Sequence, residues 1–335
     1  MPSRATSRRG GFSLIELLIA TAILSFALVY MMVSISLSNR AYTTTDQVTE
    51  SQQALRAMAY LLERDIRHTG MMVPLGASLC ADDNQGSPDV LYVTDAEAID
   101  PGDDLVPYNG AEVQGAVTNV AATGGTTTLV LDSLVVEPPS PTRAAYDADG
   151  DGTNDSDFQV NGGVIVMDLN DPTRGVACGP VTVVSVGGTS VTFQTVSKAL
   201  GNAAGAVQLV AVPAHVYAIA NGDRLTRNGR LLAEGIEDLQ LAYFIDANSD
   251  GVVDPGDMHG NGAGINANFD AQDTDMRLLR EVRLNLVVRA RNPDSEFTGE
   301  PQAFENRTAG VADNFRRRVY TSTVRVRNMD RRLSA

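Results

Sequence analysis

The sequence has no tryptophan and only three histidines. Its three histidines, His68, His215 and His259, share no metal-binding spacing such as HxxxH. It has no GxSxG elbow, no phosphate-binding P-loop and no GxGxxG turn between a strand and a helix. Asp is abundant, but turns already explain it. We therefore expect no enzymatic activity.

Cysteine is scarce as well. Cys80 and Cys178 are the only two, and their separation excludes the CxxC motifs of zinc and redox sites. Two widely spaced cysteines in an exported chain can form one disulfide. Because the N-terminal region indicates export, as argued below, we expect a Cys80–Cys178 disulfide. Two unpaired buried thiols are the alternative.

Basic residues are fewer than acidic ones. The 26 basic residues face 41 acidic ones, which gives a net charge of −15, and Lys198 is the only lysine. This sign argues against nucleic-acid binding by the whole surface and suits calcium better than phosphate. The 335 residues are 43% apolar and 20% charged, which is ordinary for a globular core, and 30 glycines predict many turns and short strands.

One long run carries no charge at all, from Leu17 to Asn39. It exceeds the about 20 apolar residues that span a bilayer as a helix. Arg4, Arg8 and Arg9 precede it and would stay cytoplasmic by the positive-inside rule. Glu16 stands at the start of the run, where a carboxylate near hydrocarbon is costly and usually has a partner.

The residues before this run resemble the prepilin processing site of type IV pilins and type II secretion pseudopilins: Arg8-Arg9-Gly10-Gly11-Phe12-Ser13-Leu14-Ile15-Glu16. The resemblance implies that a prepilin peptidase cuts after Gly11, which follows Gly10, and methylates the new amino terminus at Phe12. It also implies that Glu16 is the assembly residue. Paired with a neighbouring subunit's amine in an apolar filament core, Glu16 would set the axial register between subunits, because an unpaired buried charge is strongly unfavourable.

A secretory signal peptide or a simple signal anchor is the alternative interpretation. A signal peptide has a shorter apolar region followed by an A-x-A-like cleavage site, and neither condition is met here. A simple anchor would not need Glu16. The coincidence of the motif and the apolar run favours the prepilin interpretation.

An amphipathic stripe continues the helix beyond the apolar run. Its members recur at seven- and four-residue spacings: Val48, Leu55, Met58, Leu62 and Ile66. Gly70 and Pro74 then end the pattern. We expect one helix from about Leu14 to about His68, with its first half in membrane or filament core and its second half packed on a β-domain.

Short β-type runs between turn clusters follow from residue 71. The predicted strands are Val90–Thr94, Thr126–Val136, Gly163–Asp168, Val181–Val186, Ser190–Val196, Ala206–Val212, Val216–Ala220, Gln240–Ile245, Val282–Arg289 and Arg318–Arg327. Glycine pairs at 124–125 and 187–188 predict hairpin turns, and residues 137–157 and 254–276 predict long loops.

The fold class we expect is therefore α+β, a long N-terminal pilin helix packed on a large antiparallel β-rich globular domain. The expected divisions are a prepilin leader at 1–11, a transmembrane or filament-core helix at 12–39, its amphipathic continuation at 40–70 and the exported β-rich domain at 71–335. No second boundary is evident within the last of these.

Four stretches of the body are similar to PilW-type minor pilins: 61–70, 232–243, 279–286 and 315–328. The resemblance implies a minor pilin of the type IV pilus that helps to initiate or prime filament assembly, at or near the tip. Implied partners are other minor and major pilins, the prepilin peptidase, the inner-membrane assembly machinery and the inner membrane. The implied location is the inner membrane, as a single-pass protein with a periplasmic body, and then the pilus at the cell surface.

Two alternatives remain open at this stage. The first is a type II secretion pseudopilin of the J type, which would share the leader, helix and β-rich body. The second, of another class, is a membrane-anchored calcium-binding adhesin that uses the pilin leader only for sorting. An adhesin would tolerate loss of the Glu16 carboxylate, whereas a filament subunit would not.

Two acidic segments resemble calcium loops, in which oxygen ligands on alternate residues surround one hard cation. The ligand positions of the better one are Asp246, Asn248, Asp250, Val252 (through its carbonyl), Asp254 and Asp257. Those of the weaker one are Asp147, Asp149, Asp151, Thr153 and Asp155, and its twelfth residue, Phe158, cannot bind. Ion-free turns are the alternative, because Asp, Asn and Gly favour turns.

The C-terminal region is basic although the chain is acidic. Its arginines are Arg316, Arg317, Arg318, Arg325, Arg327, Arg331 and Arg332. We interpret them as solvated faces of a strand, since charge runs usually are. An interface with an acidic partner subunit is the alternative.

Overall fold

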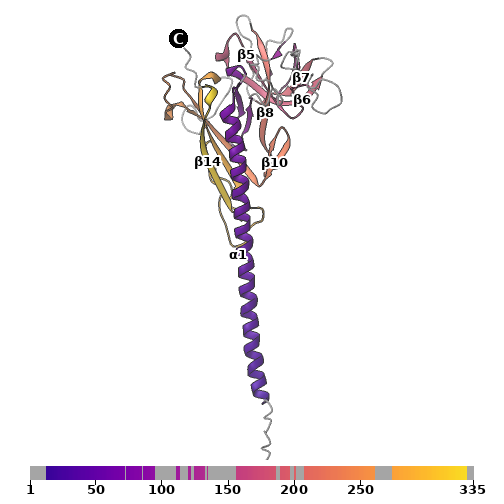
Figure 1. The fold of residues 1–335 in the computed structure, drawn as a ribbon, viewed down its shortest axis with the longest axis vertical. Coiled ribbons are helices and arrows are strands. Elements are labelled where there is room, and N and C mark those ends of the chain that lie inside the picture. The colour runs from indigo at the N-terminus through magenta and orange to yellow at the C-terminus, as the bar shows by residue number, and fades with distance from the viewer. Residues whose placement is uncertain are drawn as a thin grey trace, which may run out of the picture. The chain divides into compact units, whose positions relative to one another are not determined.

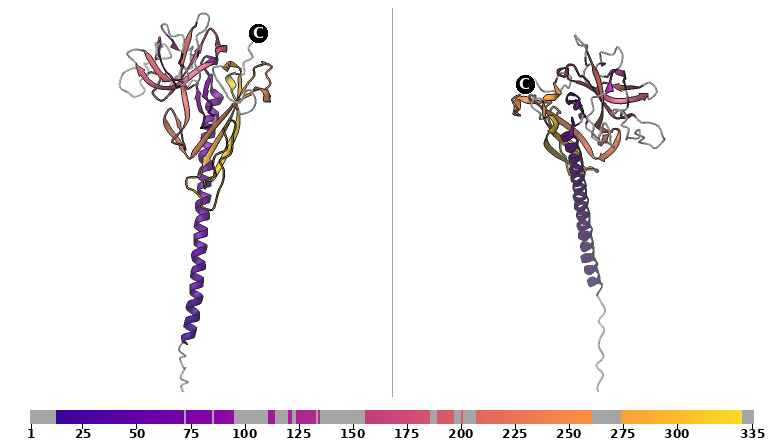
Figure 2. Two further views of the ribbon diagram at one scale, coloured as in Figure 1. Left: turned by 180° about the vertical axis from the view of Figure 1, so that it is seen from behind. Right: turned by 45° about the horizontal axis from the view of Figure 1, so that its top comes forward.

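The computed structural model describes residues 13–71, 73–84, 86–94, 111–113, 120–121, 124–132, 134, 156–185, 189–196, 200, 207–260 and 274–329. Its internal contacts divide the chain into two compact units, Met1–Glu50 and Ser51–Ala335. The first contributes most of one long helix, and the second contains the end of that helix and all of the strands (Figures 1 and 2).

Helix α1 runs from Leu14 to His68, so the predicted helix is confirmed. No glycine or proline interrupts its 55 residues, which removes the two strongest helix breakers. Gly70 follows its end with a φ of +77°, a conformation that favours glycine. The N–H of Gly70 donates to the carbonyl of Thr94 and so begins the transition to the β-rich part.

In the second unit, the end of α1 forms part of the hydrophobic core. Leu55 and Ala59 are buried, and Leu62 and Ile66 have no exposed surface at all. Tyr60, on the opposite face, is 72% exposed. The amphipathic stripe read from the sequence is therefore the packing face of the helix in this unit.

Within the described residues, ten strands form the first sheet, and every pairing in it is antiparallel. Its strand order is β1-β2-β8-β5-β6-β7-β4, while β3 and β9 also pair with β8, and β10 pairs with β9. The strands are β1 (Leu79–Asp82), β2 (Val90–Val93), β3 (Ala111–Glu112), β4 (Thr126–Val130), β5 (Gly163–Asp168), β6 (Val176–Ser185), β7 (Ser190–Gln194), β8 (Leu209–Ala220), β9 (Arg224–Arg227) and β10 (Arg230–Glu234).

A disulfide joins the two cysteines, as the sequence led us to expect. Cys80 lies in β1 and Cys178 in β6, and their Cα atoms are 6.3 Å apart. In the strand order β2, β8 and β5 stand between these two strands, so the sheet must curl until β1 reaches β6. Both cysteines are fully buried. A bridge across 98 residues of sequence stabilises a fold by about 2–4 kcal/mol.

Four strands form the second sheet, in the order β12-β11-β13-β14, again all antiparallel. They are β11 (Ile236–Ile245), β12 (Met258–His259), β13 (Leu279–Arg289) and β14 (Arg317–Arg325). Short 3-10 helices connect the strands: η1 (Leu75–Ala77), η2 (Pro172–Arg174), η4 (Pro255–Asp257), η6 (Met276–Leu278) and η7 (Arg327–Met329).

Strand β14 lies beside the last turns of α1 (Figures 1 and 2). The hydroxyl of Tyr320 donates to Oε1 of Glu63 at 2.5 Å. The side chain of Asn328 donates to the carbonyl of His68, the last helical residue. With the antiparallel sheets, these contacts confirm the α+β class, a long helix followed by a large antiparallel β-rich domain.

The two hairpin turns predicted at glycine pairs stay predictions, because residues beside or within them lie outside the described ranges. Gly124 and Gly125 exchange backbone hydrogen bonds with Thr195 and thus extend the β4–β7 ladder. The hairpin that the prediction missed joins β9 to β10 through Asn228 and Gly229, both at positive φ. Asn-Gly is the preferred pair for such a two-residue turn. The second glycine pair, 187–188, lies outside the described residues, between the paired strands β6 and β7.

The predicted strands 206–212 and 216–220 are one strand, β8. Pro213 lies within it, opposite Val164 of β5, although proline cannot donate to a ladder. The carbonyl of Pro213 accepts a hydrogen bond from the Thr94 hydroxyl instead. Of the predicted long loops, 137–155 is not described, whereas 254–276 contains η4 and β12.

Candidate functional site

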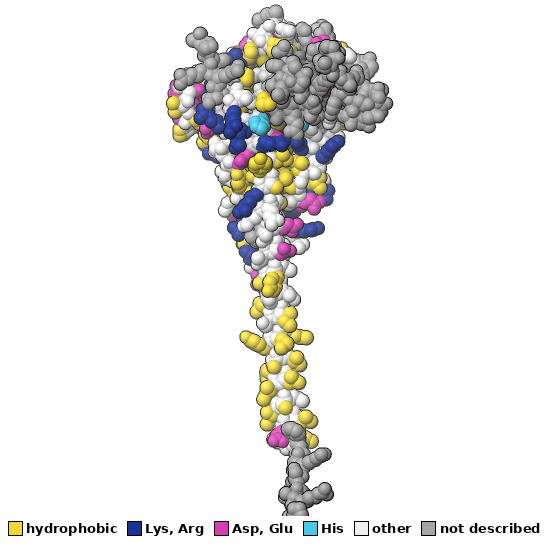
Figure 3. Space-filling view, in the orientation of Figure 1, with side chains coloured by type: hydrophobic (Ala, Val, Ile, Leu, Met, Phe, Trp, Pro, Cys, Tyr) yellow, Lys and Arg dark blue, Asp and Glu magenta, His cyan; other side chains and the backbone are white. Residues whose placement is uncertain are grey.

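The first unit presents an uninterrupted apolar surface. Its leucine, isoleucine, valine, methionine and aromatic side chains between residues 14 and 37 are 52–79% exposed. This helix is long and apolar enough to cross a membrane, judged by length and composition. Figure 3 shows these apolar side chains along the N-terminal part of α1. Burying each large apolar side chain is worth about 1.5–3 kcal/mol, so the segment gains from any apolar surroundings that it enters.

Glu16 lies in the first turn of α1. Its Oε2 accepts a hydrogen bond from the backbone N–H of Ser13 at 2.9 Å. This contact satisfies one of the free N–H groups at the helix start, where negative charge is also favoured. Gly10, Gly11 and Phe12, the predicted processing residues, lie outside the described residues.

A buried carboxylate ties the end of α1 to the first sheet. Asp65 is 1% exposed and accepts a hydrogen bond from the hydroxyl of Tyr217 in β8. Nη2 of Arg227 in β9 lies 3.4 Å from Oδ2 of Asp65, and Arg64 donates to Oδ1 at 2.9 Å. Burial and the nearby Asp65 charge raise the pKa of Tyr217, so the phenol stays a donor. This cluster fixes the rotation of the helix against the sheet.

A second buried carboxylate joins the two sheets. Asp89, in the turn between β1 and β2, accepts the N–H of Asn84 at 2.9 Å and the N–H of Leu241 in β11 at 2.8 Å. Burial raises the pKa of Asp89 to about 8, and the charges of Asp83 and Asp238 add to the effect. The acid is therefore largely protonated at neutral pH in the folded chain.

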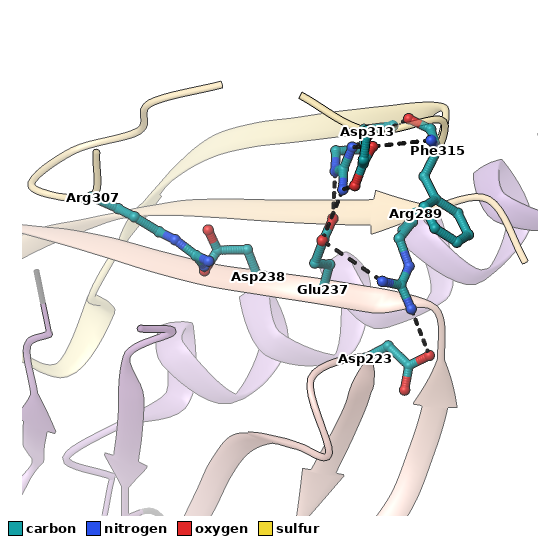
Figure 4. A network of polar contacts seen from close by, with 8 residues as sticks. Asp223, Glu237, Asp238, Arg289, Arg307, Asp313 and Phe315 are labelled. Carbon is teal, nitrogen blue, oxygen red and sulfur yellow. Dashed lines mark hydrogen bonds and ion pairs between the residues drawn. The ribbon is translucent and has the colours of Figure 1, made fainter. Parts of the chain in front are cut away.

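Ion pairs organise the second sheet and the loop before β14 (Figure 4). Arg317 contacts Glu237 of β11 and Asp313, each at 2.5 Å. Arg289 bridges Asp223 and Glu237, at 3.2 and 3.9 Å. The hydrogen bond from Arg317 lowers the pKa of Asp313 to about 2.

The C-terminal arginines thus differ from one another. Arg317 is 10% exposed, which corrects the interpretation of this side chain as a solvated strand face. Arg316 pairs with Asp294 at 2.8 Å. Arg318 is exposed on β14. Arg331 and Arg332 lie outside the described residues. Glu237 and Asp294 lie 80 and 22 residues from Arg317 and Arg316, so sequence proximity could not reveal them, whereas Asp313 lies only four residues before Arg317.

The loop from Asp246 to Asp257 has the turn of a calcium loop. Gly251 has a φ of +76°, as the sharp turn at the sixth position requires. The N–H of Gly251 donates to Oδ2 of Asp246 at 3.2 Å, and Nε of Arg280 donates to the same oxygen at 3.3 Å. Oδ1 of Asp246 is buried without a hydrogen-bond partner among the described residues.

The other acids of this loop act as acceptors for local backbone groups. Asp250 accepts from Val252, and Asp254 and Asp257 form a capping box at the start of η4. Burial and the neighbouring acids raise the pKa of Asp257 despite the hydrogen bond from Asp254. Within the described ranges, no three acidic, histidine or cysteine side chains converge as a metal site. The weaker predicted loop, 147–155, is not among those ranges.

Two protein families match the chain. Residues 201–328 match Type IV Pilus-assembly protein W, and residues 6–32 match the prokaryotic N-terminal methylation motif. The first match covers β8–β14, including the whole second sheet. The second covers the predicted processing site, Glu16 and most of the apolar run.

Other comparisons add little. No curated protein matches the chain. A solved type IV-like pilin from Thermus thermophilus is 12% identical, with a TM-score of 0.21, and the alignment covers 51% of this chain and 86% of that one. A superposition this poor carries no argument about function.

The raised pKa of Asp89 predicts a pH-dependent stability. In the unfolded chain this acid ionises near pH 3.9, whereas in the folded chain it keeps its proton until about pH 8. The unfolded state therefore binds fewer protons between these values, and Asp89 lowers the free energy of unfolding by up to about 1.4 kcal/mol per pH unit as pH rises.

The measurement is denaturant unfolding of the chain in detergent from pH 5.5 to 9, for the native protein and Asp89→Asn. We expect a shallower decline of stability with pH for the variant up to about pH 8, and parallel curves above it. Parallel curves over the whole range would show that Asp89 is ionised in the folded protein.

Proposed function

Since the chain is a type IV pilin-like protein, we propose that it is a minor pilin that helps to initiate or prime the assembly of a type IV pilus. Such a protein has a structural role. It would be held in the inner membrane with its body in the periplasm, and would then enter the filament beside other minor and major pilins.

The observation that carries this proposal is the coincidence of the methylation motif at 6–32 with an apolar helix surface that is exposed in the first unit. A membrane or a bundle of like helices would bury that surface. Cleavage after Gly11 would free an amine at Phe12, and a neighbouring subunit's amine could replace Ser13 as the partner of Glu16.

The PilW match favours the pilus over the secretion pseudopilin. It covers the C-terminal part of the body, where the second sheet and its ion pairs lie. The second unit is large, Ser51–Ala335, and a bulky body packs poorly in a repeated shaft. This size supports a place at or near the tip.

We also propose a structural calcium ion in the loop 246–257. Gly251 has the required turn, and the buried Oδ1 of Asp246 has no partner among the described residues. The fit is partial, because Arg280 occupies the other oxygen of Asp246. A calcium ion would offset the mutual repulsion of these acids and order the loop.

The assembly role of Glu16 is testable in cells that produce variants in place of the native chain. We expect Glu16→Val to reduce surface pili at least about tenfold, because the amine of a neighbouring subunit would lose its partner in apolar surroundings. The readout is the pilus count by electron microscopy. Thr21→Val, in the same segment, should leave the count unchanged.

Membrane level and leader cleavage must be equal in both variants for this comparison. Normal piliation with Glu16→Val would contradict a filament subunit and favour the calcium-binding adhesin.

The calcium proposal is tested by isothermal titration of calcium into the chain in detergent. We expect a Kd of about 10⁻⁴–10⁻³ M, as in extracellular modules, and loss of one binding event with Asp246→Asn. Asp171→Asn alters an exposed acid outside the loop and should change nothing. Equal heats for native protein and Asp246→Asn would remove calcium from this loop.

A further inference from the structure

Among the strands of the described residues, β14 pairs with β13 alone and is therefore an edge of the second sheet. At one end of β14, the backbone N–H of Ala290 donates to the carbonyl of Arg316. At the other end, the backbone N–H of Val326 donates to the carbonyl of Arg280. Because backbone direction alternates along a strand, the even-numbered residues of β14 bond to β13. The odd-numbered residues then point their N–H and C=O groups away from the sheet. For Val319, Thr321 and Thr323, none of the described residues outside β14 pairs with these groups through the backbone.

Of the usual protections against strand pairing, β14 itself has only charged side chains. Proteins cover exposed edges, shorten them, or interrupt them with proline or a bulge. β14 has nine residues and no proline, and its register with β13 is continuous from Arg317 to Arg325. Only its arginines would discourage indiscriminate pairing.

A pocket lies next to this edge. It has a volume of about 350 Å³. Val287 of β13 and Val319 of β14, which face each other across the ladder, line it together with Phe297, Phe304 and Phe315. Val319 is 37% exposed. An added strand would place the side chain opposite Val319 on the same face of the sheet, and therefore at this pocket.

Charged side chains of both signs line the pocket: Arg317, Arg318 and Glu300. Arg316 and Arg317 are paired within the chain, whereas Arg318, which also lines the pocket, is exposed and has no ion pair with any described residue. On the added strand, the residue next to the one that fills the pocket points to the opposite face of the sheet, which is the face of Arg318. A carboxylate at that position would therefore lie on the same face as Arg318.

We propose that β14 accepts an extended segment of another protein as an added strand. That segment carries an apolar side chain opposite Val319 and an acidic side chain at the adjacent position, beside Arg318. Main-chain hydrogen bonds supply the affinity, and the pocket and Arg318 supply the specificity.

A second copy of this chain fits the edge poorly. Antiparallel self-pairing centred on Thr321 would place Arg317 of each copy opposite Arg325 of the other, so the same contact between like charges would occur twice. Like charges directly opposite each other in adjacent strands are destabilising. The residue opposite Val319 would be Thr323 of the second copy, so the pocket beside Val319 would receive a threonine instead of a large apolar side chain.

The test is photo-crosslinking in cells, with a benzophenone amino acid replacing Thr321 in the full chain. The expected product joins this position to one alternating acidic and apolar segment of another protein, identified by mass spectrometry. Thr323→Pro removes one outward N–H without removing a bond to β13. It should lower the crosslinking yield about tenfold, as should Arg318→Glu. Thr323→Ala keeps the N–H and should keep the yield.

The proposal would be overturned if Thr323→Pro and Thr323→Ala gave equal crosslinking yields and Arg318→Glu also left the yield unchanged. A product formed only with a second copy, or no product at all, would overturn it too. The Arg318→Glu arm decides the outcome if Thr323→Pro fails to fold. Yields are measured in the membrane as well as in pili, so this result is independent of whether the chain primes a pilus.

Discussion

The apolar surface of the first half of α1 is the constraint on which the rest of the molecule depends. In the first unit its side chains are mostly exposed, and that exposure is unfavourable in water. A bilayer would remove the cost before the proposed assembly, and a bundle of like helices would remove it afterwards. The same surface can therefore serve both states, provided that the single carboxylate at its start, Glu16, is satisfied in each.

The second unit must stay folded whichever surroundings the first half of α1 occupies. Buried links between distant parts of the sequence achieve this. Asp65 holds the end of the helix to β8 and β9, Asp89 joins the turn after β1 to β11, and the Cys80–Cys178 disulfide closes the curled sheet. Each of these contacts crosses elements, so the unit resists local opening better than separate hairpins would.

The sequence predicted the features that depend on local pattern. The end of α1 followed from Gly70 and Pro74, and its buried stripe followed from the spacing of Leu55, Leu62 and Ile66. The β9–β10 hairpin was missed although Asn228-Gly229 is a strong local signal. Partners distant in sequence, such as Arg317 and Glu237, could not be predicted, because pairing depends on the register of β11, β13 and β14.

Surface pilus count in a strain lacking this protein, scored beside secretion of a type II substrate, is the most direct test of the proposed minor-pilin role. We predict loss of pili with normal secretion, restored by the native chain. Normal pili with lost secretion would contradict the minor-pilin assignment and make the chain a pseudopilin. If both remained normal, the chain would not be needed to assemble either filament.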